Sequence, residues 1–532
     1  MDYFKGLLFS MIGLLLFMTK NLLFIFVLLF SLNSCSVFQP VPEPRREFRG
    51  FWMATVVNID WPKSGHDSIA KQKADYLKIL DFYQDLNFNA AIVQVRTAGD
   101  AFYKSNYAPW SRYLTGEEGK APDSTQSNHK STMLSWMIDE AHNRGMEFHA
   151  WLNPYRATFD LKTETLSADH DYHRHPDWMV KYGKKYYYDP GLPAVQELMV
   201  SIIKELINNY PIDAIHYDDY FYPYTIKDET FKDSTTFNKY KLPNQSLEDW
   251  RRSNMDSLIK KSYHAIKKVR PSVQFGVSPF GVWKNKSTDP RGSDTRAGQT
   301  TFENLYADPL LWMQEGWLDY IVPQIYWSMD LEVASHRKLL DWWADHTQTT
   351  NLYIGNGPYK IKNNSDKAWN RNRELPDQLT YARKNKTVNG NVFFSAKSLM
   401  QQKKGYISRL KKKFYKNPAL PPLVNVGDFI PFKIPTLLKV EESAGKVILH
   451  FDHLQDVQHI IIYSSGNEDQ TFYQNKRILS KIFVEKENTI VLQSEDVINK
   501  KHLAYTFIDK YGKESEPKII HLKQTELYDQ KR

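Results

Sequence analysis

A strand-then-helix pattern repeats eight times between residues 47 and 416, and it restricts the fold more than any other feature of the chain. The apolar runs, rich in β-branched and aromatic residues, are 48–57, 88–95, 147–153, 212–218, 273–280, 319–326, 351–356 and 390–396. The helical patterns are 68–86, 131–145, 194–210, 246–269, 304–315, 332–347, 373–385 and 398–414. Such alternation produces parallel strands with right-handed crossovers.

Eight units in about 370 residues predict an α/β fold, a (β/α)₈ TIM-type barrel with long loops. A doubly wound open sheet is the alternative. That fold usually has fewer repeats and often a glycine-rich phosphate loop, and the sequence contains no such loop.

The pattern changes after a proline-rich linker at 417–423. Short apolar runs then follow one another at the spacing of a β-sandwich; they are 446–451, 458–463, 481–485, 489–492, 504–509 and 518–522. Residues 424–525 are therefore predicted to form a small all-β domain of immunoglobulin or fibronectin type. Because this region has no chemical motif, packing and glycan binding both remain open as its role.

The N-terminus resembles a bacterial lipoprotein signal. Lys20 precedes an apolar stretch at 22–32, and Leu32-Asn33-Ser34-Cys35 follows it. We expect a signal peptide at 1–34, lipid modification of Cys35 and an extended tether at 35–46, with the outer membrane of a diderm bacterium as the location. A retained membrane anchor is the alternative, and Met18 is an alternative start. Cys35 is the single cysteine of the sequence, which excludes an internal disulfide.

Composition excludes some classes of partner. The chain has 42% hydrophobic and 25% charged residues, which are globular values. Part of the net charge of +9 lies in a lysine- and arginine-rich run at 403–416. Such a run is either the solvated face of a helix or a contact with an anionic envelope polymer or membrane. No nucleic-acid motif is present, so we expect no nucleic-acid partner, and we expect a monomer.

Two adjacent acids, Asp218 and Asp219, end the fourth apolar run. Carboxylates are costly to place where a strand enters a core, so a pair at this position needs a reason. Aromatic side chains surround the pair in the sequence: Tyr217, Tyr220, Phe221, Tyr222 and Tyr224. Aromatic rings pack on the apolar faces of sugars while carboxylates act on their oxygens, so the pair indicates a carbohydrate site.

Functional groups of barrels lie at the carboxyl ends of the strands. Polar and aromatic residues recur at those predicted ends, and we take the following as candidates for substrate binding: Asp60, Arg96, Trp151, Asn153, Arg156, His216, Trp283, Gln324, Tyr326 and Trp327. Packing is the alternative for each aromatic residue, and a buried ion pair is the alternative for Arg96. Strand alternation directs His216 and Asp218 inward together, so Asp219 reaches the site only if the strand ends before it.

Six motifs resemble the glycosyl-hydrolase-like family ten: Arg49-Gly50-Phe51-Trp52, Gln94-Val95-Arg96, Trp151-Leu152-Asn153-Pro154-Tyr155-Arg156, His216-Tyr217-Asp218-Asp219-Tyr220, Ser278-Pro279-Phe280-Gly281 and Pro323-Gln324-Ile325-Tyr326-Trp327. The resemblance covers roughly residues 46 to 420. It implies a glycosidase-type barrel, frequently on a bacterial lipoprotein. Some members are linked to the cleavage of peptidoglycan glycan strands, notably strands without peptides.

Glycoside hydrolysis requires one acid for the leaving oxygen and a second group at the anomeric carbon. We expect Asp218 and Asp219 to be catalytic, with one of them polarising the substrate's own acetamide and the other protonating the leaving oxygen. A competing scheme pairs one of them with Asp60 or Asp189. His216 is expected to hydrogen-bond Asp218 rather than to act directly. Neither scheme needs a cofactor or a metal.

Two other classes of function remain open. A metal-dependent polysaccharide deacetylase also uses adjacent aspartates, and His170, His173 and His175 lie close together in the sequence, although not at the spacing of a helical zinc site. A non-catalytic glycan-binding lipoprotein is the second alternative.

Overall fold

The computed structural model describes residues 44–122, 132–424, 432–443, 446–465, 474–484, 487–493 and 502–520. They belong to one compact unit, Glu43–Arg532. The predicted signal peptide, Cys35 and most of the predicted tether lie outside the described residues. Within those ranges, no helix combines the length and the apolar character that crossing a membrane requires.

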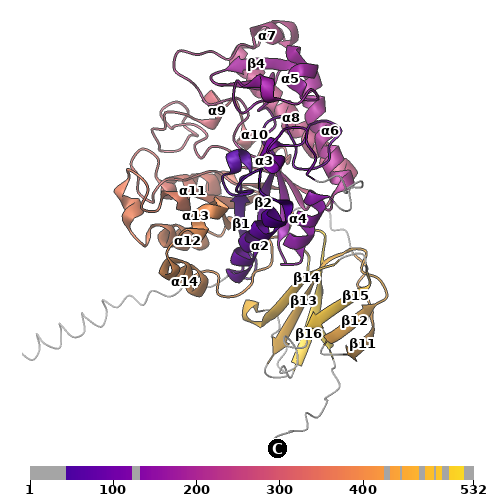
Figure 1. The fold of residues 1–532 in the computed structure, drawn as a ribbon. Coiled ribbons are helices and arrows are strands. Elements are labelled where there is room, and N and C mark those ends of the chain that lie inside the picture. The colour runs from indigo at the N-terminus through magenta and orange to yellow at the C-terminus, as the bar shows by residue number, and fades with distance from the viewer. Residues whose placement is uncertain are drawn as a thin grey trace, which may run out of the picture. The chain divides into compact units, whose positions relative to one another are not determined.

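Eight parallel strands close into a barrel, as the sequence predicts (Figure 1). They are β1 (Phe48–Met53), β2 (Ala90–Arg96), β3 (Glu147–Leu152), β6 (Ala214–Tyr217), β7 (Gln274–Val277), β8 (Tyr320–Ile321), β9 (Asn351–Asn356) and β10 (Val388–Phe394). Closure comes from β1, which pairs with both β2 and β10. All eight predicted strands are present, and several are shorter than the apolar runs that predicted them.

Helices follow the barrel strands in every interval. The main ones are α2 (Ile69–Asp85), α4 (Met133–His142), α6 (Pro193–Asn209), α8 (Leu247–Val269), α10 (Pro309–Gln314), α11 (His336–His346), α12 (Glu374–Lys384) and α14 (Lys404–Lys413). Shorter helices are α3 (Arg112–Thr115), α5 (Asp171–Arg174), α7 (Ser234–Tyr240), α9 (Thr301–Asn304) and α13 (Ala396–Met400). Side chains of Ser68, Ser246 and Ser335 cap α2, α8 and α11 by accepting a backbone N–H.

Two helix boundaries differ from the sequence prediction. The pattern at 304–315 becomes a helix only at Pro309, where proline fits the first turn because its missing N–H would have no partner there. The pattern at 398–414 divides into α13 and α14. Hydrophobic periodicity continues across both breaks, so it could not locate them.

A β-hairpin lies in the long connection after β3 and was not predicted. Its strands are β4 (Met179–Tyr182) and β5 (Lys185–Tyr188). Its backbone pairs with the segment that leaves β3, through Ala157 N to Tyr186 O (3.1 Å) and Tyr188 N to Tyr155 O (2.9 Å). The hairpin therefore places β5 beside the carboxyl end of β3.

The barrel interior is partly polar. Trp52 donates from Nε1 to His216 Nε2 (3.2 Å), and Tyr320 Oη contacts both His216 Nδ1 (3.1 Å) and His149 Nδ1 (2.9 Å). These pairs join strands that are not neighbours, so they meet across the interior. Gly276 makes room for this arrangement, because a Cβ there would lie 2.0 Å from the Tyr320 ring.

The C-terminal region forms two antiparallel sheets. One contains β11 (Leu437–Ser443), β12 (Lys446–Phe451) and β15 (Thr489–Gln493); the other contains β14 (Ile478–Phe483), β13 (Val457–Ser465), β16 (His502–Asp509) and β17 (Lys518–Ile520). Side chains from both sheets, such as Leu449 and Phe507, share one buried hydrophobic cluster. This arrangement agrees with the predicted β-sandwich.

Candidate active site

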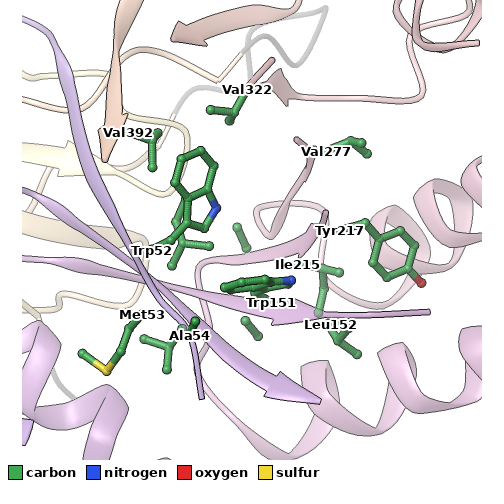
Figure 2. Close-up of a cluster of buried hydrophobic side chains, with 14 of the residues drawn as sticks. Trp52, Met53, Ala54, Trp151, Leu152, Ile215, Tyr217, Val277, Val322 and Val392 are labelled. Carbon is green, nitrogen blue, oxygen red and sulfur yellow. The ribbon is translucent and has the colours of Figure 1, made fainter. Parts of the chain in front are cut away.

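The acid pair lies directly after a barrel strand. β6 ends at Tyr217, whose hydroxyl contacts Ser262 of α8 (3.5 Å), so Tyr217 points outward, away from Trp52 and Trp151 (Figure 2). His216 consequently points inward. Because the strand ends before Asp218, the chain turns there and Asp219 is not forced outward. Both acids are buried, each with 4% of its surface exposed.

Asp218 is held by the ends of two neighbouring strands. Asn153, which follows β3, donates from Nδ2 to Asp218 Oδ2 (2.5 Å), and the backbone N–H of Tyr220 donates to Oδ1 (3.2 Å). Gln94 of β2 donates in turn to Asn153 Oδ1 (2.5 Å). The Gln94 oxygen accepts the backbone N–H of Val56 (2.9 Å), which extends the chain of hydrogen bonds to the segment after β1.

Asp219 has different partners. The hydroxyl of Tyr224 donates to its Oδ2, and the side chain of Gln324, just after β8, also hydrogen-bonds to it. Gln324 Nε2 itself donates to the carbonyl of Ser278 after β7 (2.9 Å). The two acids are therefore positioned by different parts of the barrel rim, although they are neighbours in the sequence.

The environment raises the proton affinities of both acids. Burial and, after it, the charge of Asp219 together raise the pKa of Asp218 to about 7. Burial also raises the pKa of Asp219, while the Tyr224 hydroxyl and Gln324 oppose that rise. A negative charge on Asp219 therefore favours the protonated form of Asp218, which retains a proton up to near-neutral pH.

Half-buried aromatic rings line the rim around the acids. Tyr220, Tyr224, Phe280 and Trp327 form a continuous series with ring centroids 5.5–6.0 Å apart. A second group contains Tyr326, Tyr359 and Phe394, each 6.0 Å from the other two. Tyr326 and Trp327 were predicted from the sequence. Phe280, Tyr359 and Phe394 were not predicted as site residues; the signal available was their place at a strand end.

Both predicted arginines are buried. Arg96 donates to the hydroxyl of Tyr188 (3.2 Å), which donates to Asp171 (2.8 Å), so Arg96 reaches a carboxylate only through a tyrosine. The Arg156 guanidinium lies 4.5 Å from the centre of the Tyr220 ring, and its charge lowers the pKa of both Asp218 and Asp219.

The expected hydrogen bond between His216 and Asp218 is not formed, because both ring nitrogens of His216 have other partners. Its Nε2 contacts Trp52 Nε1 and Ser278 Oγ (3.0 Å), and its Nδ1 contacts Tyr320. Since an indole N–H can only donate, Nε2 carries no proton and Nδ1 does. Burial holds the pKa of His216 well below its ordinary value, so the ring is neutral and belongs to the interior network.

Asp60 and Trp283 occupy structural positions. Asp60 accepts from Ala54 N (2.8 Å), Ser395 Oγ (2.7 Å) and Lys397 N (2.8 Å), which engages both of its oxygens. Trp283 donates to Asp308 (3.0 Å) and stacks on Trp342. Trp151 lies inside the barrel with His149 and Asn153 on the same side of β3, and its buried indole N–H has no partner among the described residues.

The histidines of the deacetylase alternative have other contacts. His170 Nε2 contacts the carbonyl of Ala157 (3.1 Å), and its Nδ1 accepts the backbone N–H of Tyr172 (2.9 Å). His175 stacks on Trp178. In the part of the chain that the structure describes, no group of three or more His, Cys, Asp or Glu side chains is arranged to hold a metal ion.

A surface cleft of about 660 Å³ lies elsewhere, between α6 and α8. Its lining includes Lys204, Lys260, Lys268 and Trp317, and none of the strand-end residues above belongs to it. We place the site at the strand ends because the buried carboxylates and converging donors are there.

A closed barrel with paired carboxylates among aromatic rings at its strand ends is the architecture of glycoside-hydrolase-type barrels. Residues 47–371 match the model of the family described as glycosyl hydrolase-like 10, and the chain belongs to that family. It is 41% identical over 443 residues to glycosyl hydrolase YngK of Bacillus subtilis, covering 81% of this chain and 86% of that protein. It is 39% identical over 337 residues to glycosyl hydrolase DigH of Escherichia coli, covering 60% of this chain and 75% of that protein.

Solved structures resemble the chain only distantly. The glycoside hydrolase domain of PgaB from Bordetella bronchiseptica matches with a TM-score of 0.45 and 11% identity, over 70% of this chain and 99% of that one. The spore cortex-lytic enzyme SleL of Bacillus megaterium matches with a TM-score of 0.38 and 10% identity, over 70% of this chain and 75% of that one. Likeness at this level carries no conclusion about the reaction.

Proposed function

We propose that this protein is a glycosidase that hydrolyses an envelope glycan, with peptidoglycan glycan strands as the substrate. The observation that carries the proposal is the buried pair Asp218–Asp219, which separate strand ends hold by different hydrogen bonds. A structural role for the pair is disfavoured, because burying two adjacent carboxyls costs free energy that packing does not require. Family membership and the aromatic rim support the same reading.

Asp218 is the proposed general acid. With a pKa of about 7, roughly half of the Asp218 carboxyls carry a proton at pH 7, and a negative charge on Asp219 favours that form. Asp218 would give its proton to the glycosidic oxygen as the bond between that oxygen and the anomeric carbon breaks. Water then supplies the hydroxyl at the anomeric carbon and returns a proton to Asp218.

Asp219 is the proposed partner of the substrate's acetamide. An ionised carboxylate accepts the acetamide N–H and so makes the acetamide oxygen a better nucleophile toward the anomeric carbon. The bond between that oxygen and the anomeric carbon forms as the glycosidic bond breaks, and it breaks in turn when water attacks the anomeric carbon. Tyr224 and Gln324 favour the ionised form of Asp219 and fix its orientation. The competing partner Asp60 is less suited, because backbone N–H groups and Ser395 occupy both of its oxygens.

The proposed setting is the cell envelope. A lipid on Cys35 would hold the protein, as a monomer, at the outer membrane of a diderm bacterium, where glycan strands are within reach. The lipobox-like Leu32-Asn33-Ser34-Cys35 is the support for this part of the proposal.

The test is digestion of intact and peptide-free peptidoglycan, with mass analysis of the product ends. Asp218→Asn and Asp219→Asn should each lower kcat by about 10²–10⁴-fold, because each removes a group from the acid–base step. Asp228→Asn is the matched control, since Asp228 lies in the same loop and is exposed; it should retain wild-type turnover. Binding of strands without release of reducing ends, or zinc-dependent release of acetate, would contradict the glycosidase proposal.

A further inference from the structure

Four arginines are buried among the residues that the structure describes: Arg49, Arg96, Arg156 and Arg251. Arg49 and Arg251 pair with Glu47 (2.7 Å) and Asp233 (2.6 Å). Arg96 reaches Asp171 through Tyr188. Arg156, like Arg96, has no carboxylate within 4.0 Å among these residues, but it also lacks a hydroxyl that bridges it to one, which departs from the rule that buried charges are paired.

Arg156 also leaves most of its hydrogen-bonding capacity unused. A guanidinium has five N–H donors, and that of Arg156 makes a single hydrogen bond within the described residues, to the carbonyl of Thr97 at 3.4 Å. Its Nε is buried without a partner. The Tyr220 ring covers one face of the guanidinium, and because the N–H donors lie in the plane of the group, the ring does not block them.

A second cation lies close by. Lys185 is the first residue of β5, and the backbone pairing of Arg156 with Tyr187 brings that strand alongside. No carboxylate of the described residues lies within 4.0 Å of Lys185, whose Nζ sits 4.9 Å from the centre of the Phe159 ring. Burial and, to a smaller extent, the charge of Arg156 together lower the pKa of Lys185 to about 8.

We propose that Arg156 and Lys185 form a subsite that binds a carboxylate carried by a sugar of the substrate, next to the acid pair. The inference rests on the proposed function and adds to it the chemical class of the sugar. The charge of Arg156 acts on Asp218 and Asp219, but neither carboxyl lies within 4.0 Å of its guanidinium. An acetamide or hydroxyl oxygen would occupy one donor and bring no charge of its own. A carboxylate accepts two parallel N–H bonds from Arg156 and offsets charge on both residues.

Two kinds of sugar supply such a group. One is a sugar with a lactyl ether, whose carboxylate is free in peptide-free peptidoglycan and becomes an amide when a peptide is attached. The other is a uronic acid. Both present a carboxylate close to the ring, and the experiment separates them.

The experiment compares three substrates with the full-length wild-type protein. The first is peptide-free peptidoglycan strands, the second is the same strands with their carboxylates converted to amides by carbodiimide and ammonia, and the third is hyaluronan oligosaccharides, which carry glucuronate. We expect kcat/KM for the free strands to exceed that for the amidated strands by about tenfold or more. Preferential cleavage of hyaluronan would identify the uronic acid as the source of the carboxylate.

Substitutions of Arg156 and Lys185 test whether these two residues cause the preference for free over amidated strands. Lys185→Gln and Arg156→Gln should bring the ratio of kcat/KM for free over amidated strands close to one, and Arg156→Lys should retain part of it. Lys184→Gln is the matched control, because Lys184 is the exposed neighbour in the same hairpin turn, and it should leave the ratio unchanged.

Failure of this inference differs from failure of the proposed function. Equal cleavage of free and amidated strands by the wild type would overturn the carboxylate subsite and leave the glycosidase intact. If neither substrate is cleaved, the glycosidase proposal fails, and calorimetric titration with free and amidated strands still tests the subsite. Equal affinities for free and amidated strands would overturn the carboxylate subsite. Tighter binding of the free strands by the wild type, together with loss of that difference in Lys185→Gln, would support the subsite.

Discussion

At the scale of single residues, the acid pair owes its chemistry to unequal surroundings. Asp218 and Asp219 are both 4% exposed, yet one accepts from an amide and a backbone N–H while the other accepts from a tyrosine hydroxyl. Burial raises both pKa values, and the ionised Asp219 raises that of Asp218 further. Two groups whose proton affinities are pushed apart can divide the roles of acid and base.

The pH profile tests this division. If Asp218 is the general acid, its protonated form is the active one, so kcat should fall by about tenfold per pH unit above the pKa of about 7. The measurement is kcat on peptide-free glycan strands between pH 5 and 9. An activity that stays constant from pH 6 to 9 would contradict the assignment to Asp218.

A substitution of Asn153 gives a second test of Asp218 as the general acid. Replacing it with Asp removes the amide that donates to Asp218 and adds a third carboxyl to the pair, which raises the pKa of Asp218 further. In Asn153→Asp the high-pH limb of the kcat profile should move to higher pH. A limb that shifts to lower pH would show that the amide does not act on Asp218.

At the scale of elements, Asp60 joins the segment after β1 to the start of α13. Its carboxylate accepts the backbone N–H of Ala54 and of Lys397, and the hydroxyl of Ser395. Ser395 and Lys397 lie 335 and 337 residues from Asp60 in the sequence. The contact therefore fixes where the last strand turns into its helix.

Asp60→Ala should lower the free energy of unfolding by about 2–4 kcal/mol, because it leaves buried donors without a partner. Denaturant unfolding followed by fluorescence measures the change. KM of the folded variant should stay near the wild-type value. A wild-type unfolding midpoint with a strongly raised KM would instead support the substrate-binding role that the sequence suggested.

At the scale of the whole molecule, Glu47 stabilises the seam where the barrel closes. It precedes β1 and accepts from Arg49 (2.7 Å) and, through both oxygens, from Arg383 of α12 (2.7 Å each). Burial by itself would raise the pKa of Glu47, but the two arginines outweigh it and hold the pKa below its usual value.

A carboxyl with a lowered pKa contributes stability that is present above its unfolded pKa and is lost as the pH falls through the folded one. Glu47→Gln should therefore cost about 3 kcal/mol of unfolding free energy at pH 7, and the cost should shrink in acid. Glu140→Gln is the control, since it removes a partly exposed pair with Arg144 and should cost about 1 kcal/mol or less. An equal loss of unfolding free energy in the two variants would contradict a special stabilising role for Glu47 at the closure of the barrel.

The proposed lipid anchoring also concerns the whole molecule. Cys35→Ala should move the protein from the membrane fraction to the soluble fraction of a diderm host, because the cysteine thiol is the proposed site of lipid attachment. Fractionation and immunoblotting give the readout. Retention of the variant in membranes would favour an uncleaved anchor.

The local sequence was sufficient to predict the barrel and to single out the adjacent acids Asp218 and Asp219 as candidates. Strand and helix periodicities are set by which face of each element is buried, and an adjacent pair of acids after an apolar run is visible without any contact. The same patterns could not show the partners of each side chain. Asp60 and His216 sit at strand ends as predicted, but residues from distant strands occupy their polar atoms.

Only the tertiary structure showed that Tyr224 and Gln324 hydrogen-bond to Asp219. It also showed that a hairpin at 179–188 pairs with the backbone of Arg156 and brings Lys185 near that residue. Those contacts depend on where closure of the barrel and the long loop after β3 place groups that are far apart in the chain. Sequence periodicity reports burial along one element, whereas a site forms where several elements meet.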